Sequence, residues 1–188
     1  MFPAPFRVVV DACALFPVSL CDTLLRAAAA DYFQLHWSAE ILDEARRNLG
    51  KTGISADKAA MRFAQMERAF PEAMVTGHEP LIDAMLNDPK DRHVVAAAVK
   101  AGAQVIVTSN LCDFVTLPDG IEAQSPDDFL GNLFDLDPDR FVALLQDQAR
   151  ALKRPPVTFA QVLAALAKSA PAFAALVSEH VGLPPPPS

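Results

Sequence analysis

The sequence lacks the features of several large classes of protein. Its 188 residues include 3 cysteines and 7 glycines, and its formal net charge is −7. Cysteines that form no CxxC pair and are odd in number cannot make a disulfide framework, and no histidine has a zinc-like spacing to them. We expect each cysteine to be a small buried residue in a reducing cytoplasm. No two glycines have the spacing of a GxGxxG or P-loop motif, which disfavours nucleotide-cradling enzymes. The acidic balance disfavours a protein that mainly coats nucleic acid.

Long apolar runs are also absent. A membrane span needs roughly 18 to 20 apolar residues, and Lys168 and Pro171 interrupt the Ala-rich C-terminal part. The N-terminal segment has no basic region before its apolar residues and is broken by Pro3 and Pro5. We therefore expect a soluble, cytoplasmic protein with no signal peptide and no membrane contact.

The hydrophobic pattern that is present predicts strands alternating with helices. A strand opens segment 7–16, and others are expected at 33–37 and 103–108. Helices are expected at 19–30, 39–49, 56–70 and 89–101. Parallel strands joined by helical crossovers indicate an α/β fold with helices on both faces of the sheet.

Strand signals vanish beyond Ser125, where three helices replace them. They are expected at 126–133, at 138–152, and at 159–181 with a break near Pro171. The sequence thus predicts an α/β domain over 1–125, a C-terminal helical extension over 126–183 and a proline-rich tail over 184–188.

Two aspartates follow predicted strands. Asp11 comes directly after the VVV run, and Asp113 follows the TSN end of the strand at 103–108. Ligands of a parallel α/β sheet bind outside the carboxyl ends of its strands, so both carboxylates should face one edge. The alternative for each is a turn or helix-capping role.

Among the acids of the helix after Ser38, helix geometry singles out one. Glu44 lies at the boundary of the apolar face, whereas Glu40 and Asp43 point to solvent. The alternative for Glu44 is an ordinary surface pair with a neighbour on the next turn.

A fourth acidic region is the stretch from Asp88 to His93. Asp88 before Pro89 has the pattern of an N-cap with proline at the first helical position, and Asp91 then falls where an acid completes a capping box. Because Ser125 and Asp137 also precede Pro-Asp pairs, capping explains this spacing at least as well as chemistry does.

Four carboxylates in one cleft repel each other unless a cation neutralises them. Ligation by oxygen alone suits Mg²⁺ or Mn²⁺ rather than zinc. If the acids converge, we expect such a hard divalent cation between them.

Three segments together resemble the PIN-domain family of metal-dependent ribonucleases, and within it the VapC-like toxins of toxin-antitoxin modules. The segments are VVVDACAL, WSAEILDEARRNL and DPKDRHVVAAAVKAGAQVIVTSNLCDF, in that order. The resemblance covers about residues 7–130. It implies a three-layer α/β/α sandwich with a parallel sheet, and a cleft of acids that binds Mg²⁺ or Mn²⁺ and cleaves RNA.

The resemblance also assigns roles to individual positions. The implied catalytic and metal-binding acids are Asp11, Glu44, Asp91 and Asp113, with Asp88 and Asn110 in a second tier. The chain departs from part of the family at Asn110, where an acid is usual, so the number of metals stays open.

RNA must still approach an acidic cleft. Between positions 46 and 68 the chain carries six basic residues against two acidic ones. Candidate contacts to the RNA backbone are Arg46, Arg47, Lys51 and Arg62, and the alternative is a solvated helix face.

The implied partners are an RNA substrate and a protein antitoxin, and the helices beyond residue 125 could also form a homodimer. Two other functions remain open at this stage. One is a catalytically inactive PIN-like scaffold that binds a partner. The other is a phosphate-transferring enzyme with Asp11 as nucleophile, which is disfavoured because Cys13 stands where a second acid is expected.

Overall fold

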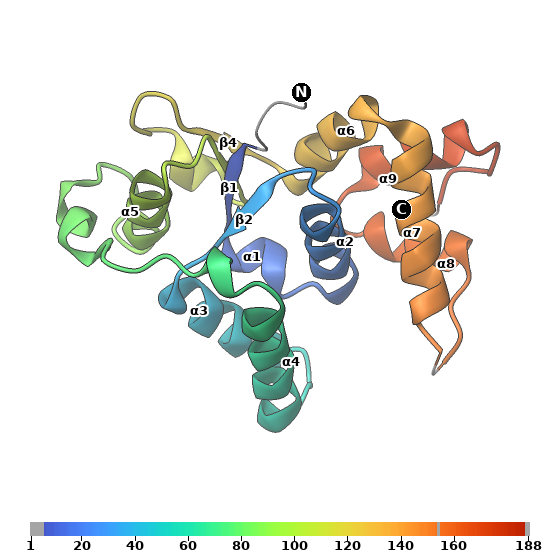
Figure 1. Cartoon of the computed structure of the whole chain (residues 1–188), viewed down its shortest axis with the longest axis horizontal. Helices are drawn as coiled ribbons and strands as arrows, with labels where there is room; N and C mark the ends of the chain where they lie inside the picture. Colours follow the sequence, from blue (N-terminus) through green and yellow to red (C-terminus); the bar gives the residue numbers. More distant parts are fainter. Residues whose placement is uncertain (1–5, 154, 187–188) are drawn as a thin grey trace. The chain divides into compact units, whose positions relative to one another are not determined.

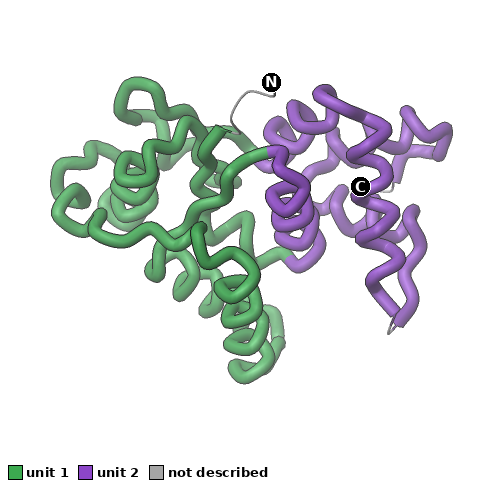
Figure 2. The backbone as a smooth tube through the Cα atoms, in the orientation of Figure 1, with its two compact units in different colours: residues 1–17, 33–125 green, residues 18–32, 126–188 purple. Residues whose placement is uncertain are grey.

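The structure, a computed structural model of the chain, describes residues 6–153 and 155–186. The first five residues, part of the segment used to exclude a signal peptide, and the end of the 184–188 tail lie outside the described residues. The chain divides into two compact units, shown in Figure 2. Unit 1 comprises 1–17 and 33–125, and unit 2 comprises 18–32 and 126–188. The predicted limits of 1–125, 126–183 and 184–188 stay a prediction.

Unit 1 contains a four-stranded parallel sheet in the order β2-β1-β3-β4 (Figure 1). Its strands are β1 (Arg7–Val10), β2 (Gln34–His36), β3 (Val105–Val107) and β4 (Glu122–Gln124). The two central strands are the β-branched runs VVV and VIV, and they are fully or almost fully buried, as the sequence predicts. Strand β4 was not predicted, because its residues Glu-Ala-Gln at the edge of the sheet carry no apolar run.

The helical segments of unit 1 connect these strands. They are α1 (Ala12–Leu15), α3 (Ala39–Gly50), α4 (Ala56–Ala69), η1 (Pro71–Ala73), η2 (Glu79–Ala84), α5 (Arg92–Ala101) and η3 (Leu111–Phe114). The Ser38 and Ser55 side chains cap α3 and α4 as expected, each accepting a hydrogen bond from a backbone N–H of the first turn. Helix α5 packs on β1 and β3 and ends at Gly102, whose φ of 64° is left-handed.

The described residues of unit 2 form helices joined by loops, with one isolated bridge between Lys153 and Pro156. The helices are α2 (Val18–Ala29), α6 (Pro126–Leu136), α7 (Pro138–Ala151), α8 (Phe159–Leu166) and α9 (Pro171–His180). The predicted break near Pro171 is confirmed, since this proline opens α9. Helix α2 packs on α7 and α8, although it lies between the first two strands in the sequence. A parallel sheet flanked by helices, with further helices at the C-terminal end, confirms the predicted fold class.

A search of the described helices for candidate membrane spans found none that combines the necessary length and apolar character.

Candidate active site

Asp11 stands at the carboxyl edge of the sheet, where β1 and β3 end side by side. Val10 is in register with Val107, and the Asp11 backbone N–H still donates to the Val107 carbonyl at 3.0 Å. The carboxylate is buried and caps α1, because its Oδ1 accepts from the Ala12 N–H at 2.7 Å. Its Oδ2 accepts from the Thr108 hydroxyl at 2.8 Å. Asp11 therefore has the capping role that the sequence analysis gave as the alternative. Its second oxygen, Oδ2, binds Thr108 at the carboxyl edge of the sheet.

Two neighbours that fix Asp11 were not identified from the sequence. Thr108 is fully buried, and its Oγ1 also accepts the Asn110 N–H at 3.1 Å. The Cys13 Sγ lies 3.1 Å from Asp11 Oδ2 and accepts the Ser109 N–H at 3.1 Å. A hydroxyl directly after the VIV run was the available signal for Thr108, but it was treated only as the end of a strand.

The expectation that every cysteine is a small buried residue is wrong for two of the three. Only Cys21 is buried, Cys13 is half-buried and Cys112 is exposed. Burial, together with the charge of Asp11, raises the pKa of Cys13 to about 12. The Cys13 thiol is therefore neutral at physiological pH and can donate its proton toward Asp11.

Asp91 immediately precedes α5, and here the predicted helix start is wrong. The helix begins at Arg92 rather than at Pro89, so Asp91 is the N-cap residue and not a member of the first turn. Asp88 instead forms a turn, in which its Oδ1 accepts the Lys90 N–H at 3.1 Å. The Asp91 side chain makes no capping hydrogen bond. Sequence spacing could not separate these cases, because a Pro-containing turn and a Pro-initiated helix share the same residues.

The Asp91 carboxylate is buried and incompletely paired. It is 6% exposed, and its Oδ2 accepts no hydrogen bond. Burial, with a further contribution from the Asp11 charge, raises the pKa of Asp91 to about 6. A buried carboxylate oxygen that accepts no hydrogen bond can bind a ligand from outside the chain.

Glu44 reaches toward this edge from α3. Its half-buried position beside the buried Ala45, with Glu40 and Asp43 exposed, confirms the predicted helix face. The Glu44 Oε2 lies 3.7 Å from the Nε2 of His93 on α5. His93 is thus a further site residue that sequence reasoning did not propose.

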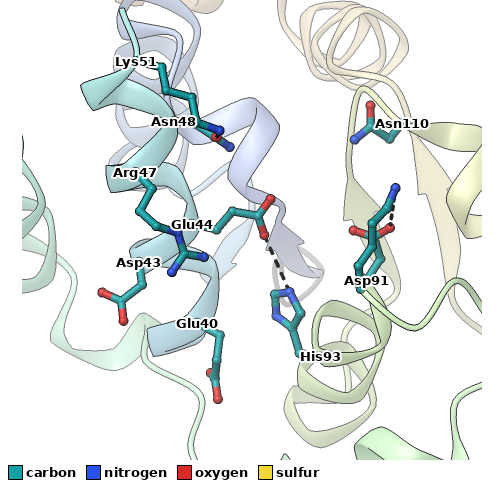
Figure 3. Close-up of a pocket in the computed structure, with 10 residues that line it drawn as sticks. Glu40, Asp43, Glu44, Arg47, Asn48, Lys51, Asp91, His93 and Asn110 are labelled. Atoms are coloured by element: carbon teal, nitrogen blue, oxygen red, sulfur yellow. Dashed lines mark hydrogen bonds and ion pairs between the residues drawn. The ribbon is translucent and has the colours of Figure 1, made fainter. Parts of the chain in front are cut away.

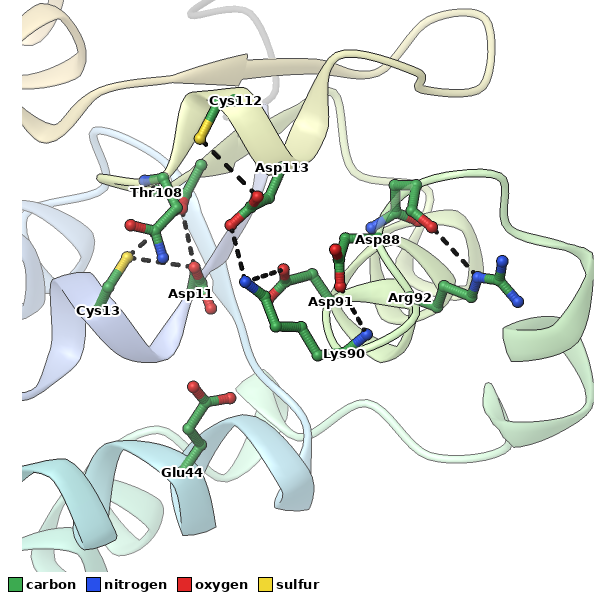
Figure 4. A network of polar contacts seen from close by, with 12 residues as sticks. Asp11, Cys13, Glu44, Asp88, Lys90, Asp91, Arg92, Thr108, Cys112 and Asp113 are labelled. Carbon is green, nitrogen blue, oxygen red and sulfur yellow. Dashed lines mark hydrogen bonds and ion pairs between the residues drawn. The ribbon is translucent and has the colours of Figure 1, made fainter.

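Asp113 lies in η3, and Lys90 joins it to Asp91 (Figure 4). The Lys90 Nζ is 3.2 Å from Asp113 Oδ2 and 3.8 Å from Asp91 Oδ2. The hydrogen bond that the Lys90 ammonium donates to Asp113, helped by the charges of both aspartates, raises the pKa of Lys90. Its ammonium group therefore stays charged beside the two carboxylates at neutral pH.

A hollow of about 600 Å³ in unit 1 is bordered by Glu44, Lys90, Asp91 and His93, but not by Asp11 or Asp113 (Figure 3). Its lining residues are Glu40, Asp43, Glu44, Arg47, Asn48, Lys51, Lys90, Asp91, His93 and Asn110. The hollow therefore combines carboxylates with Arg47 of α3 and with Lys51, the residue that follows this helix.

The candidate RNA contacts divide into two pairs. Arg47 and Lys51 line the hollow. Arg46 instead pairs with Asp43 at 3.0 Å, and Arg62 donates to the Leu15 carbonyl at 3.5 Å. Arg47 and Lys51 are thus the two of the four candidates that border the hollow, and the Lys51 ammonium donates there to Asn48 Oδ1 at 3.0 Å.

The donor set suits a hard divalent cation. It is composed of carboxylate oxygens, one of which is buried and accepts no hydrogen bond. The Lys90 ammonium already occupies a cationic position beside Asp91 and Asp113. In the described residues, however, no three Asp, Glu, His or Cys side chains are grouped closely enough to hold a metal ion as they stand. Binding of such an ion would therefore require these side chains to rotate toward it.

A parallel sheet with acidic residues just beyond its central strands is an arrangement in which α/β proteins bind ligands. Residues 7–111 match the family described as PIN domain, and residues 126–179 match the VapC50 C-terminal domain. The chain belongs to the PIN-domain family.

One relative is a Mycobacterium tuberculosis protein named "Putative ribonuclease VapC50". It is 43% identical to this chain over 106 residues, which are 55% of this chain and 63% of the relative. The match thus spans less than two thirds of that protein. No solved structure gives a significant match to the chain.

Proposed function

We propose that this protein is a Mg²⁺- or Mn²⁺-dependent endoribonuclease and the toxin of a toxin-antitoxin module. The observation that carries the proposal is the buried Asp91 oxygen without a hydrogen bond, at a sheet edge shared with Asp11 and Asp113. Membership of the PIN-domain family and similarity to a protein named as a ribonuclease support it. RNA is accordingly the proposed substrate.

The residues of the chain have distinct roles in this proposal. Asp11, Glu44, Asp91 and Asp113 are the cation ligands, and a divalent ion bound there supplies an activated water and neutralises charge on the leaving oxygen. Thr108 fixes the orientation of Asp11 through its 2.8 Å hydrogen bond, and His93 restrains Glu44. Arg47 and Lys51 neutralise RNA phosphates at the side of the hollow that α3 provides.

Cleavage of a fluorescently labelled single-stranded RNA tests the activity. We expect cleavage with Mg²⁺ or Mn²⁺, none in EDTA, and none by Asp11→Asn. Asp147→Asn is the matched control, because Asp147 is exposed in unit 2 and pairs only with Arg150 in the ion pairs of the described residues. Cleavage that persists in EDTA refutes the metal mechanism. If wild type shows no cleavage on any RNA tested, the alternative of a partner-binding scaffold is favoured.

We further propose that residues 126–183 form a C-terminal domain that binds a segment of an antitoxin. The match of 126–179 to the VapC50 C-terminal domain supports a separate evolutionary unit. An antitoxin with a basic side chain could neutralise the acidic hollow in the way that Lys90 partly does. Expression of wild type should slow growth, and expression of Asp11→Asn should not. Equal growth of the two strains, at equal protein levels, contradicts the toxin proposal.

A further inference from the structure

Lys90 is an exposed lysine whose ammonium group lies beside two carboxylates. Its side chain is 64% exposed, yet the ammonium group bends back to Asp113 and Asp91 instead of extending into solvent (Figure 4). Lys90 belongs to the turn before α5, whose Asp88 accepts its backbone N–H. The turn thus holds the root of the side chain beside the carboxylates it contacts.

The two oxygens that Lys90 contacts are needed for the proposed cation. Asp113 Oδ2 is its nearer partner, and Asp91 Oδ2 is the buried oxygen that accepts no hydrogen bond. A divalent ion coordinated by the same oxygens and an ammonium group beside them would repel each other. The divalent ion and the Lys90 ammonium therefore compete for the same two carboxylate oxygens.

We propose that Lys90 is a tethered counter-ion of the site, which a divalent cation must displace from Asp113 and Asp91 before the site is loaded. This inference rests on the proposed function and adds a role for a residue outside the ligand set. Lys90 neutralises the carboxylates in the metal-free protein and raises the metal concentration at which the site fills. An exposed side chain can leave without rearranging the core, so displacement needs only a rotamer change.

The competing explanation is a structural one, in which the pair merely ties the turn to η3. Exposed ion pairs contribute little to stability, so this role predicts a small loss of stability on removal of Lys90 and no gain in metal affinity. A counter-ion predicts the opposite for the metal, because removing it frees both oxygens. Metal affinity thus separates the two explanations without any measurement of activity.

The experiment is a calorimetric titration of the full-length, metal-free protein with Mn²⁺ in the absence of RNA. We expect Lys90→Met to bind Mn²⁺ on the order of tenfold more tightly than wild type, and Lys90→Arg to stay near wild type. Lys100→Met is the matched control, because Lys100 is an exposed residue of α5, the helix that follows the Lys90 turn, and its loss changes the net charge equally. A rise in melting temperature on adding Mn²⁺ should likewise be larger in Lys90→Met than in wild type.

The outcomes separate this inference from the proposed function. Equal affinities of Lys90→Met and Lys100→Met, or weaker binding by Lys90→Met, overturn the counter-ion role while Asp11-dependent Mn²⁺ binding leaves the nuclease proposal standing. Binding that Asp11→Asn does not weaken, or an absence of Mn²⁺ binding, overturns both. Tighter binding by Lys90→Met alone, with Asp11→Asn weakened, supports both.

Discussion

The two units treat buried polar groups differently. In unit 2, the buried Thr23 hydroxyl donates to Gln148 at 2.8 Å, and the buried Ser178 hydroxyl donates to the Ala174 carbonyl at 2.9 Å. In unit 1, the buried side chains of Asn87 and Asp91 retain atoms without a hydrogen bond. Among the described residues, the Tyr32 hydroxyl is the unit 2 exception in this respect.

The apolar cores differ as well. Unit 2 contains a cluster of aromatic rings in edge-to-face contact, in which Phe141 lies 5.3 Å from Tyr32, 6.3 Å from Phe134 and 5.6 Å from Phe173 between ring centroids. Unit 1 has its buried valines in the central strands and its acids directly beyond them. Unit 2 thus has a packed aromatic core that should stabilise the protein. Unit 1 instead retains buried polar atoms without hydrogen bonds, as binding sites often do.

The largest effect should come from the unit 2 core. Phe141→Ala removes a fully buried ring that contacts three other aromatic rings, and should lower the free energy of unfolding by about 3–5 kcal/mol. Leu136→Ala is the control, since Leu136 is 68% exposed and should change stability by less than about 0.5 kcal/mol. Urea denaturation measures both. A loss below about 1 kcal/mol for Phe141→Ala would mean that this cluster does not stabilise the protein.

In unit 1 we expect a substitution that lowers activity but raises stability. Asp91→Asn should reduce RNA cleavage by about a hundredfold or more, because a carboxylate ligand is lost, and yet make the metal-free protein more stable at pH 7. The stability gain arises because a neutral side chain replaces a buried charge near Asp11. Cleavage assays and melts in EDTA measure the two quantities. If stability falls together with activity, Asp91 is a structural residue rather than a strained ligand.

A smaller effect should follow from Thr108. Thr108→Val keeps the shape of the side chain but removes the donor to Asp11 and the acceptor of the Asn110 N–H, so we expect a 10- to 100-fold loss of metal affinity or activity. Thr108→Ser retains the hydroxyl and should recover most of the loss. An active Thr108→Val would show that Asp11 is oriented adequately by the Ala12 N–H alone.

Much of the architecture of unit 1 could be predicted from the sequence. The VVV and VIV runs and the serine caps identified the central strands and two helices, and the carboxyl-edge rule directed attention to Asp11 and Asp113. Residues near in sequence and periodic in pattern are predictable because local physics dictates them. The assignment of α2 to unit 2 was not, since it depends on contacts with helices more than a hundred residues later, as between Thr23 and Gln148.

The candidate site was predictable in its charged residues and not in their supports. Asp91 was named through the family resemblance, but its spacing placed it in the first turn of a helix expected from Pro89, whereas the helix begins at Arg92. Thr108, His93 and Lys90 were missed because a hydroxyl, an imidazole and a lysine have no distinctive spacing. Their roles depend on which residues the fold brings within 4 Å of one another.

The smallest effect concerns pH and uses Asp91 again. Its folded pKa of about 6 lies above the roughly 3.9 of an unfolded aspartate, so the folded state binds more protons between these values. The stability contributed by the protonated form is present below pH ~4 and is lost as pH rises through about 6. The stability difference between Asp91→Asn and wild type in EDTA should therefore grow from pH 4 to about 6.5 and then level off. Asp147→Asn, which alters an exposed group of unit 2, should show no such rise. A difference that is flat across this range for Asp91→Asn would place the Asp91 carboxylate in a solvated environment and remove the contrast between the two units at that residue.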